Sequence, residues 1–283
     1  IFYFWRMNKF QVIQPSLLLA PYVKQYWFLT MANVDYNSQR LVPFGCSALS
    51  FYRGHRTYSL FEDDYLPQSH LYGIATDYVD ISFSGNIDFI CIIFQPAGTK
   101  AFFNIPLVEL NGSYASLDSL NDKELHQLEK RLNDTTDNFA CVGFIEQFLF
   151  NRIYKLDQYK ERRVSTAINL IYQGETDINR LAETTCLSYK QFKRVFLEHV
   201  GTNPKEYLQI TRFQKLYHLL QQHSDKTLEQ LSEECGYYDK SHLIKELKEF
   251  SGFTPSELAK VCDSIYSDYH SLFRSAFIDL FPE

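Results

Sequence analysis

The chain contains one pattern twice, and this repeat constrains the fold more than any other feature. The first copy runs from Asp177 to Leu208 and reads DINRLAETTCLSYKQFKRVFLEHVGTNPKEYL. The second copy runs from Thr227 to Leu258 and reads TLEQLSEECGYYDKSHLIKELKEFSGFTPSEL. In each copy a short apolar stretch, a tight turn and a longer amphipathic stretch follow in the same order. The repeat therefore predicts two copies of one helical unit.

In the first copy, the caps and the apolar spacing predict two helices joined by a turn. Asp177 and Ser188 have side chains that accept hydrogen bonds from the first free N–H groups of a helix. Phe192, Val195 and Phe196 recur at helical spacing, so they are expected to pack inward. The residues expected on the outer face of this second helix are Lys190, Gln191, Lys193 and Arg194.

The second copy repeats this arrangement, with a turn that is longer by one residue. Thr227 is expected to cap a short helix, and Asp239 to open the second one. The inward face of this second helix is expected to hold Leu243, Leu247 and Phe250, and its outer face Lys240, Ser241, Lys245 and Lys248. Residues 205–222 predict a long helix that joins the two copies.

A short helix, a tight turn and a second amphipathic helix match a helix-turn-helix, which inserts its second helix into the major groove of DNA. Two copies on a rigid spacer predict two such helices on one DNA face, separated by about 34 Å, one turn of the duplex. The formal net charge of −6 argues against strong nonspecific DNA binding. Residues 160–260 nevertheless hold slightly more basic than acidic residues, so the position of the charge matters more than its total.

The N-terminal part has a different composition, with short runs rich in aromatic and β-branched residues. Runs such as QYWFLT (25–30), SALSFYR (47–53), YVDISFS (78–84) and IDFICIIFQ (87–95) predict strands, separated by turn residues that include Gly85 and Asn86. After Leu117 the apolar spacing becomes helical. The sequence therefore predicts an α+β protein of two domains. The first is an antiparallel β-barrel or sandwich followed by helices, and the second an all-α double helix-turn-helix.

We expect a β-rich domain over residues 7–157, a DNA-binding domain over 158–262 and a C-terminal extension over 263–283. The boundary is placed in the polar segment KLDQYKERR, residues 155–163. Met7 suggests that the six residues before it, IFYFWR, precede the natural start.

Residues 163–260 resemble the DNA-binding domain of the AraC/XylS family of bacterial transcription regulators. The resemblance is carried by LAETTCLS, FKRVF, Gly201 with Pro204, RFQKLYHLL, LSEECGYYDKSHL and LKEFSGFTPSEL. It implies base-reading positions at Lys190, Lys193 and Arg194 in the first copy, and at Lys240, Ser241 and Lys245 in the second. The full set of predicted DNA-contacting residues is Ser188, Lys190, Gln191, Lys193, Arg194, Lys240, Ser241, Lys245 and Lys248.

The second copy departs from the family pattern in two ways. Its apolar anchors are Leu243 and Leu247, where the family commonly has Phe. Glu246 and Glu249 are expected to add negative charge to its second helix. Electrostatic attraction to DNA is therefore expected to favour the first copy.

The N-terminal half resembles the cupin-like sensor or dimerisation domain that precedes such DNA-binding domains. The resemblance is carried by LLLAPYVKQYWFL, LVPFGCSALSFY and FICIIFQPAGTKAFFNIPLVEL. The resemblance to the AraC/XylS family implies a cytoplasmic, nucleoid-associated regulator whose partners are double-stranded promoter DNA and RNA polymerase. Control by a small-molecule effector, with ligand-binding residues unknown, is one alternative. A domain that serves only homodimerisation or protein interaction is another.

The sequence does not favour an enzyme, a metal site or a cofactor. Cupin-type metal catalysis needs clustered His ligands, but His55 and His70 are isolated and no HxH occurs, so a cupin-like enzyme fused to a DNA-binding module is the least favoured alternative. The six cysteines form no CxxC. The apolar runs are shorter than the ~20 residues that cross a bilayer, which predicts no membrane partner. Tyr26 and Trp27 are interpreted as core or interface aromatics.

Overall fold

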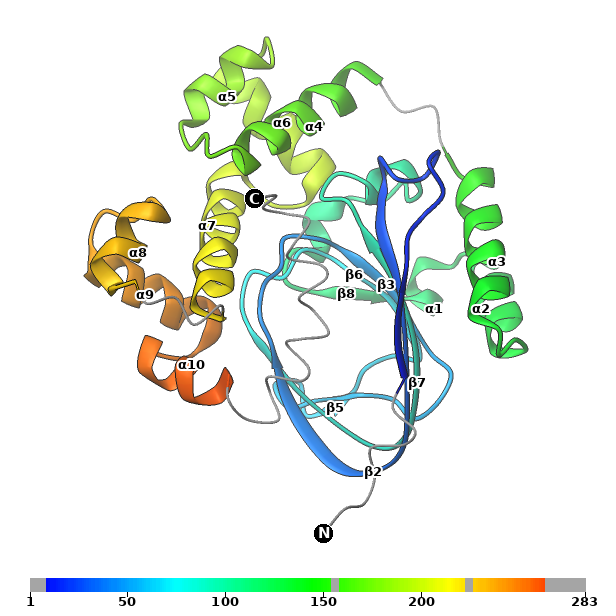
Figure 1. The fold of residues 1–283 in the computed structure, drawn as a ribbon. Coiled ribbons are helices and arrows are strands. Elements are labelled where there is room, and N and C mark those ends of the chain that lie inside the picture. Colours follow the sequence, from blue (N-terminus) through cyan, green and yellow to red (C-terminus); the bar gives the residue numbers. More distant parts are fainter. Residues whose placement is uncertain (1–8, 154–157, 222–225, 263–283) are drawn as a thin grey trace.

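The aromatic-rich segment and the repeat form two distinct layers in the computed structural model, which describes residues 9–153, 158–221 and 226–262 (Figure 1). The strands are β1 (Lys9–Ile13), β2 (Val23–Leu41), β3 (Ala48–Tyr52), β4 (Tyr58–Ser59), β5 (Asp64–Tyr65), β6 (Ser69–Tyr72), β7 (Val79–Phe94) and β8 (Tyr114–Ser116). The helices of this part are the 3₁₀ helices η1 (Thr99–Ala101) and η2 (Leu107–Leu110), and α1 (Leu117–Leu120), α2 (Lys123–Asn133) and α3 (Asn138–Asn151).

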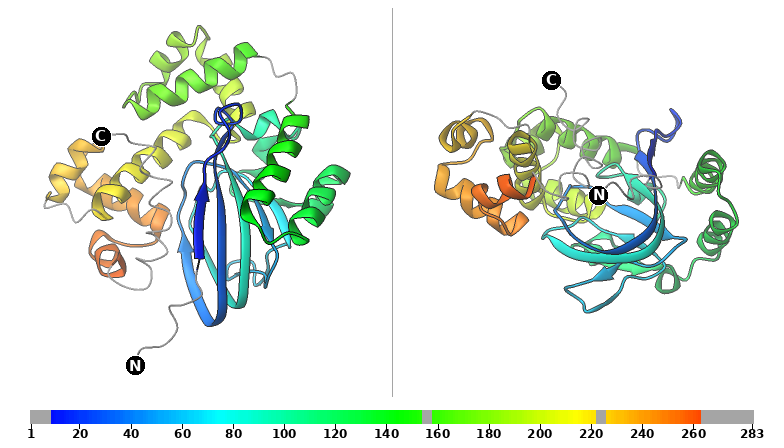
Figure 2. Two further views of the ribbon diagram at one scale, coloured as in Figure 1. Left: turned by 45° about the vertical axis from the view of Figure 1, so that its right-hand side comes forward. Right: turned by 60° about the horizontal axis from the view of Figure 1, so that its bottom comes forward.

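The strands form one antiparallel sheet in the order β1-β2-β7-β3-β6-β8, with the short β4 paired to β5 and β7. This confirms the predicted antiparallel β domain that precedes helices. The sheet is strongly curved (Figure 2), but it is not closed as a barrel, because β1 and β8 remain its two ends.

One predicted turn is instead part of a strand. The expected strands 78–84 and 87–95 are continuous in β7, although we placed a turn at Gly85 and Asn86 between them. Gly85 has a φ of +79°, and the partner strand β2 shifts register on both sides of Val34, which pairs with Gly85. Any Cβ at Gly85 would overlap the ring of His55. The glycine therefore bends a long strand around His55 without reversing the chain.

Side chains alternate along the central strands and divide the sheet into two different faces. Leu49 of β3 and Ile90 and Ile92 of β7 join the core that the sheet shares with α2 and α3. Their neighbours Cys91 and Ile93 turn to the concave face, where they pack with Trp27. One face is therefore covered by helices, and the concave face lines a cavity.

The repeat and the segment before it fold into seven helices within the described residues. They are α4 (Gln158–Tyr172), α5 (Ile178–Thr184), α6 (Tyr189–Val200), α7 (Pro204–Gln221), α8 (Leu228–Glu234), α9 (Lys240–Ser251) and α10 (Pro255–Cys262). The all-α double helix-turn-helix is thereby confirmed, with α5–α6 and α8–α9 as its two copies. Asp177, Ser188, Thr227 and Asp239 are all N-caps, as predicted.

Helix α7 lies between the two copies and carries the core of this layer. Its inward side chains are almost completely buried and belong to one cluster with residues of α4, α6 and α9: Tyr207, Ile210, Phe213, Leu216 and Tyr217. The ring of Tyr207 meets Phe196 of α6 with centroids 5.5 Å apart, and the ring of Phe213 lies 5.2 Å from Phe250 of α9. Both copies are therefore fixed to the same helix.

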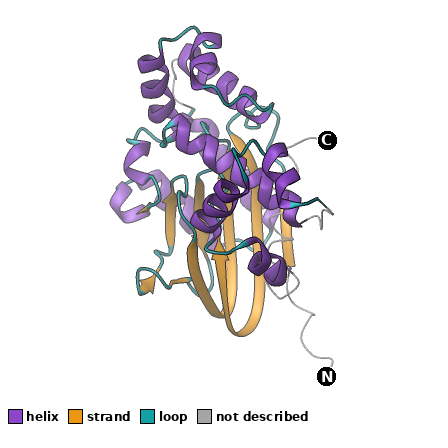
Figure 3. Ribbon diagram, turned by 90° about the vertical axis from the view of Figure 1, so that its left-hand side faces the viewer, coloured by secondary structure: helices purple, strands orange, loops and turns teal. Residues whose placement is uncertain are grey.

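The β domain contacts the C-terminal ends of α6 and α9, and its sheet lies behind the helical layer in Figure 3. Gly201 ends α6 and Gly252 ends α9, each with a left-handed φ that favours glycine. A Cβ on Gly201 would lie 2.9 Å from the carbonyl oxygen of Leu107, and one on Gly252 would lie 2.1 Å from Nη1 of Arg40. Equivalent positions of the repeat thus face two different parts of the β domain.

Some of the expected boundaries fall outside the described residues. Residues 154–157, 263–283 and 1–8 include part of the expected domain boundary, the C-terminal extension and the segment before Met7. The domain limits therefore stay a prediction.

Replacing Phe213 by Ala is expected to lower the free energy of unfolding by about 3–5 kcal/mol, because it leaves a cavity beside Tyr217 and Phe250. Phe139→Ala in α3 is the matched control, since the Phe139 side chain is 67% exposed. It is expected to change that free energy by less than about 0.5 kcal/mol. Urea unfolding followed by circular dichroism measures both, and equal losses would contradict the assignment of Phe213 to the core.

Candidate nucleic-acid interface

Helix α6 is held by a capping box at its start and an apolar stripe on one side. The Ser188 hydroxyl accepts a hydrogen bond from the Gln191 N–H (3.3 Å), and the Gln191 side-chain oxygen accepts one from the Ser188 N–H (3.1 Å). Phe192, Val195 and Phe196 are buried, as predicted. Ser188 and Gln191 are exposed, but their side chains already stabilise the helix start.

The cationic side chains of α6 lie on the exposed side of this helix. Lys190, Lys193 and Arg194 are all exposed, and in the described part of the chain none of them has an ion-pair partner. The Lys193 ammonium lies 5.5 Å from the centre of the Tyr189 ring. The positive end of the helix dipole adds to their field. The first half of α6 therefore forms an uncompensated cationic surface.

Helix α9 exposes a weaker cationic surface. Ser241, Lys245 and Lys248 are exposed and border a shallow hollow together with Glu249. Lys240 is exposed as well, but its ammonium lies 3.1 Å from the Glu229 carboxylate of α8. Part of the charge of Lys240 is therefore already compensated within the protein.

The expectation that Glu246 adds negative charge to the outer face of α9 is wrong. Its side chain is 3% exposed, and the Arg212 guanidinium of α7 donates two hydrogen bonds to its carboxylate, one of them 2.9 Å long. Burial alone would lower the pKa of Arg212, but the bonds to Glu246 raise the pKa above its usual value. Position 246 follows Leu243 by three residues, so the helix turns it inward.

Two tyrosines near the starts of these helices were missed by the sequence reasoning. Tyr238 is 92% exposed and Tyr189 is 47% exposed. Each lies next to an N-cap, Asp239 or Ser188, and this position is the only sequence signal that could have identified them. Both flank the cationic side chains described above.

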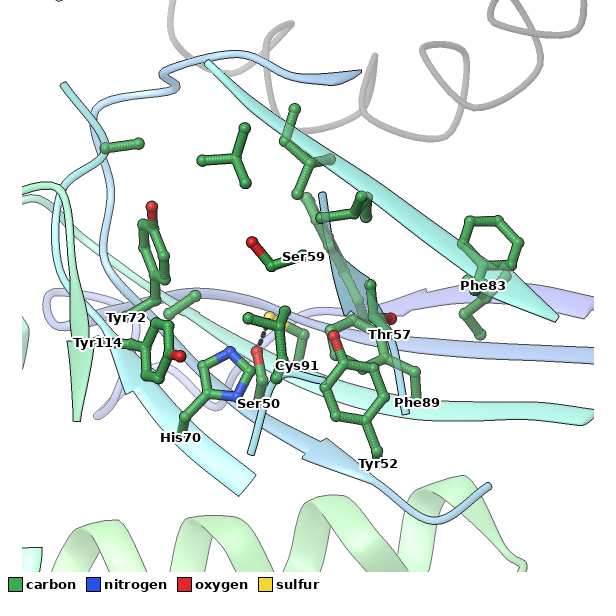
Figure 4. Close-up of a pocket in the computed structure, with 18 of the residues that line it drawn as sticks. Ser50, Tyr52, Thr57, Ser59, His70, Tyr72, Phe83, Phe89, Cys91 and Tyr114 are labelled. Carbon is green, nitrogen blue, oxygen red and sulfur yellow. Dashed lines mark hydrogen bonds between the residues drawn. The ribbon is translucent and has the colours of Figure 1, made fainter. Parts of the chain in front are cut away.

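The concave face of the sheet lines a cavity of about 220 Å³, which supplies the candidate ligand site that the sequence did not locate. Its wall includes Trp27, His70 and Cys91 (Figure 4). The interpretation of Trp27 as a core aromatic is confirmed, because its buried ring belongs to a core cluster, and the same ring also borders this cavity. His55, which we considered together with His70, packs against Gly85 instead.

Within the described residues, no group of three or more His, Cys, Asp or Glu side chains is placed to hold a metal ion. In the same part of the chain, no helix combines the length and the apolar composition needed to cross a bilayer.

Two family profiles match this chain. One is described as "Helix-turn-helix domain" and matches residues 181–260, which contain both helix-turn-helix copies. This match supports the resemblance of the helical layer to the DNA-binding domain of the AraC/XylS family. The other profile is described as "Domain of unknown function (DUF6597)" and matches residues 11–116, which contain the β-sheet.

Similar proteins are transcription regulators from bacteria. An HTH-type transcriptional regulator of Haemophilus influenzae is 32% identical over 104 residues, which cover 36% of this chain and 35% of the relative. The transcriptional activator RhaS of Escherichia coli is 24% identical over 167 residues, covering 53% of this chain and 59% of RhaS. The matches thus span between about a third and three fifths of these relatives. Both relatives are described as transcription regulators.

Two solved structures resemble the chain more loosely. ToxT from Vibrio cholerae aligns with 85% of this chain and 99% of its own, with 11% identity and a TM-score of 0.45. The DNA-binding domain of AdpA, solved in complex with a target DNA, covers 41% of this chain and 94% of its own, with 20% identity and a TM-score of 0.30.

The buried imidazole of His70 is expected to make stability depend on pH. Burial lowers its pKa from the usual 6.5 to about 4, so between these pH values only the unfolded chain binds the proton. Above pH 6.5 His70 is neutral in both states, so its titration does not change the free energy of unfolding. As the pH falls from 6.5 to 4, protonation of the unfolded chain lowers this free energy. The loss amounts to about 3 kcal/mol.

His70→Phe removes this titration. The difference in unfolding free energy between the two proteins is therefore expected to change by about 3 kcal/mol between neutral pH and pH 4. Urea titrations at a series of pH values measure it. A difference that stays constant with pH would contradict a neutral His70 in the folded protein.

Proposed function

We propose that this protein is a sequence-specific DNA-binding transcription regulator that places α6 and α9 in successive major grooves of promoter DNA. The observation that carries the proposal is that both helices expose a cationic first half while their apolar stripes pack on the same helix, α7. A separation fixed by α7 suits two grooves that face one side of the duplex. One chain then reads a DNA site for which proteins with one helix-turn-helix per chain need a dimer.

The two helices divide base reading and phosphate contact unequally. Arg194 is exposed and has no partner within the described residues, so its planar guanidinium is available for bidentate hydrogen bonds to guanine. Lys190 and Lys193 add further base-edge contacts from α6.

In α9 we assign base contacts to Ser241 and Lys245 and a phosphate contact to Lys248. Lys240 contributes once its pair with Glu229 opens. Ser188 and Gln191 contact the backbone of DNA from the start of α6.

We propose that a small-molecule effector in the cavity controls the second copy through Arg40. Leu41 and Val79 line the cavity, and the residues next to them, Arg40 and Asp80, form a bidentate ion pair with both N···O distances at 2.6 Å. The third guanidinium nitrogen, Nη1, donates to the carbonyl oxygen of Ser251 in the last turn of α9 (3.2 Å). The same guanidinium lies 4.7 Å from the ring centre of Phe253. A ligand that displaces β2 or β7 would therefore move the anchor of α9.

The remaining parts of the proposal rest on the resemblance to the AraC/XylS family. We propose RNA polymerase and a second copy of this chain as protein partners, and a cytoplasmic, nucleoid-associated location. We infer that the protein has no catalytic activity. The alternative, a β domain that serves dimerisation only, predicts that cavity-filling substitutions leave DNA binding and its control unchanged.

Hydroxyl-radical footprinting on an operator selected from random DNA tests the paired arrangement. The full chain is expected to protect two patches on one face of the duplex, about 10 base pairs apart. Protection of a single patch, or of patches on opposite faces, would exclude simultaneous binding of both helices.

Replacing Arg194 by Ala is expected to weaken binding to the preferred operator by about 1–3 kcal/mol and to relax its sequence preference. Lys248→Ala is expected to weaken binding to all sequences alike and to reduce the slope of log K against log salt by about one. Arg131→Ala in α2 makes the same charge change as Arg194→Ala far from both helices and serves as the control.

Competition binding to the operator and to scrambled DNA at several salt concentrations distinguishes these outcomes. If Arg194→Ala keeps full discrimination while Lys240→Ala loses it, the dominant reader lies in the second copy.

A further inference from the structure

The wall of the cavity is almost entirely apolar or aromatic and contains few charges. Phe44, Phe89 and Ile93 are among the residues that enclose it. Of all its lining residues, only Glu62 carries a formal charge, and no Lys or Arg lines it in the described part of the chain. The Tyr114 hydroxyl donates a hydrogen bond to the Glu62 carboxylate (2.6 Å). The cavity therefore offers no cation that could compensate an anionic ligand.

The neutral polar groups gather at one end of the cavity (Figure 4). The Ser50 hydroxyl donates to the Cys91 sulfur (3.7 Å), and His70 lies beside them on the neighbouring strand β6. The His70 ring is held between two aromatic rings, with centroid distances of 6.0 Å to Tyr52 and 5.4 Å to Tyr114. Burial raises the pKa of the Cys91 thiol to about 12, so this group stays uncharged as well.

His70 supplies a hydrogen-bond acceptor that is directed into the cavity. Its Nδ1 lies 3.3 Å from the carbonyl oxygen of Pro67, and because a carbonyl only accepts, Nδ1 carries the proton. The buried ring is neutral, so Nε2 is left with a lone pair. In Figure 4 the other ring nitrogen points toward the interior of the cavity. A ligand that reaches this end must therefore donate a hydrogen bond.

We propose that the cavity binds an uncharged, mainly aromatic small molecule whose hydroxyl group donates a hydrogen bond to Nε2 of His70. A phenol or an aromatic alcohol has this chemistry. An aromatic carboxylate does not, because it would bury its charge without a partner and would meet the lone pair of His70. This inference rests on the proposed function, in which the cavity holds the effector.

Isothermal titration calorimetry of the full chain with three probes of one shape tests the ligand class. The probes are 4-propylphenol, propylbenzene and 4-propylbenzoate, at neutral pH. We expect 4-propylphenol to bind about tenfold or more tighter than 4-propylbenzoate, and tighter than propylbenzene. Stronger binding of the benzoate, or no binding of any probe, would overturn the proposal. These comparisons use the unmodified protein, so they do not depend on the folding of a variant.

His70→Phe keeps an aromatic ring between Tyr52 and Tyr114 but removes the acceptor. It is expected to reduce the preference for 4-propylphenol over propylbenzene to within about twofold, because the lost hydrogen bond is the difference between the two probes. His126→Phe is the control, since His126 lies on the outer surface of α2, where its imidazole contacts Asp118. An unchanged preference in His70→Phe would exclude His70 as the acceptor.

Footprinting without any probe separates this inference from the proposed function. Failure to bind DNA sequence-specifically overturns the regulator itself. Normal footprints combined with a preference for the benzoate overturn only the ligand class.

Discussion

The buried side of α7 is the constraint on which the rest of the helical layer depends. Phe213 packs against α9 and Tyr207 against α6, so both helices are positioned by the same rigid element. Two helices on a flexible linker would meet DNA independently, whereas two helices on one packed core meet it in a fixed register. The close packing of protein interiors makes this register a property of side-chain shape, since displacement of α7 would disturb both copies at once.

The same helices are also held from the other side, at their C-terminal ends. Gly201 and Gly252 occupy equivalent places in the repeat, and both face the β domain. The contacts differ in chemistry: α6 packs on the backbone at Leu107, whereas α9 is reached by the guanidinium of Arg40. Packing against backbone leaves little freedom, while an ion-paired side chain can rearrange. This difference is the physical reason why we propose that the effector acts on the second copy, through α9, and not on the first.

The arrangement leaves the first halves of α6 and α9 exposed while the β domain is docked. Arg194 and Lys245 lie on exposed surface, and the burial of Glu246 against Arg212 removes an acidic charge from the side that carries Lys245. The proposed DNA contacts therefore lie on the first halves of α6 and α9, whereas the β domain that holds the cavity contacts the C-terminal ends of the same helices. The polar end of the cavity lies around His70, and Arg40 lies beside cavity-lining residues of β2. Strands β2 and β7 connect these two regions through one continuous sheet.

The sequence by itself determined the helical layer, because capping and helical spacing are local. Ser188 and Thr227 cap their helices, and Phe192 and Phe250 face inward, as their patterns predict. Only the tertiary structure decided what depends on long-range pairing. The negative charge of Glu246 is compensated by its ion pair with Arg212 of α7. Strand β7 continues through Gly85 because β2 and His55 accommodate the bend. The cavity is assembled from strands far apart in the chain, so no local pattern around Trp27 or His70 could reveal it.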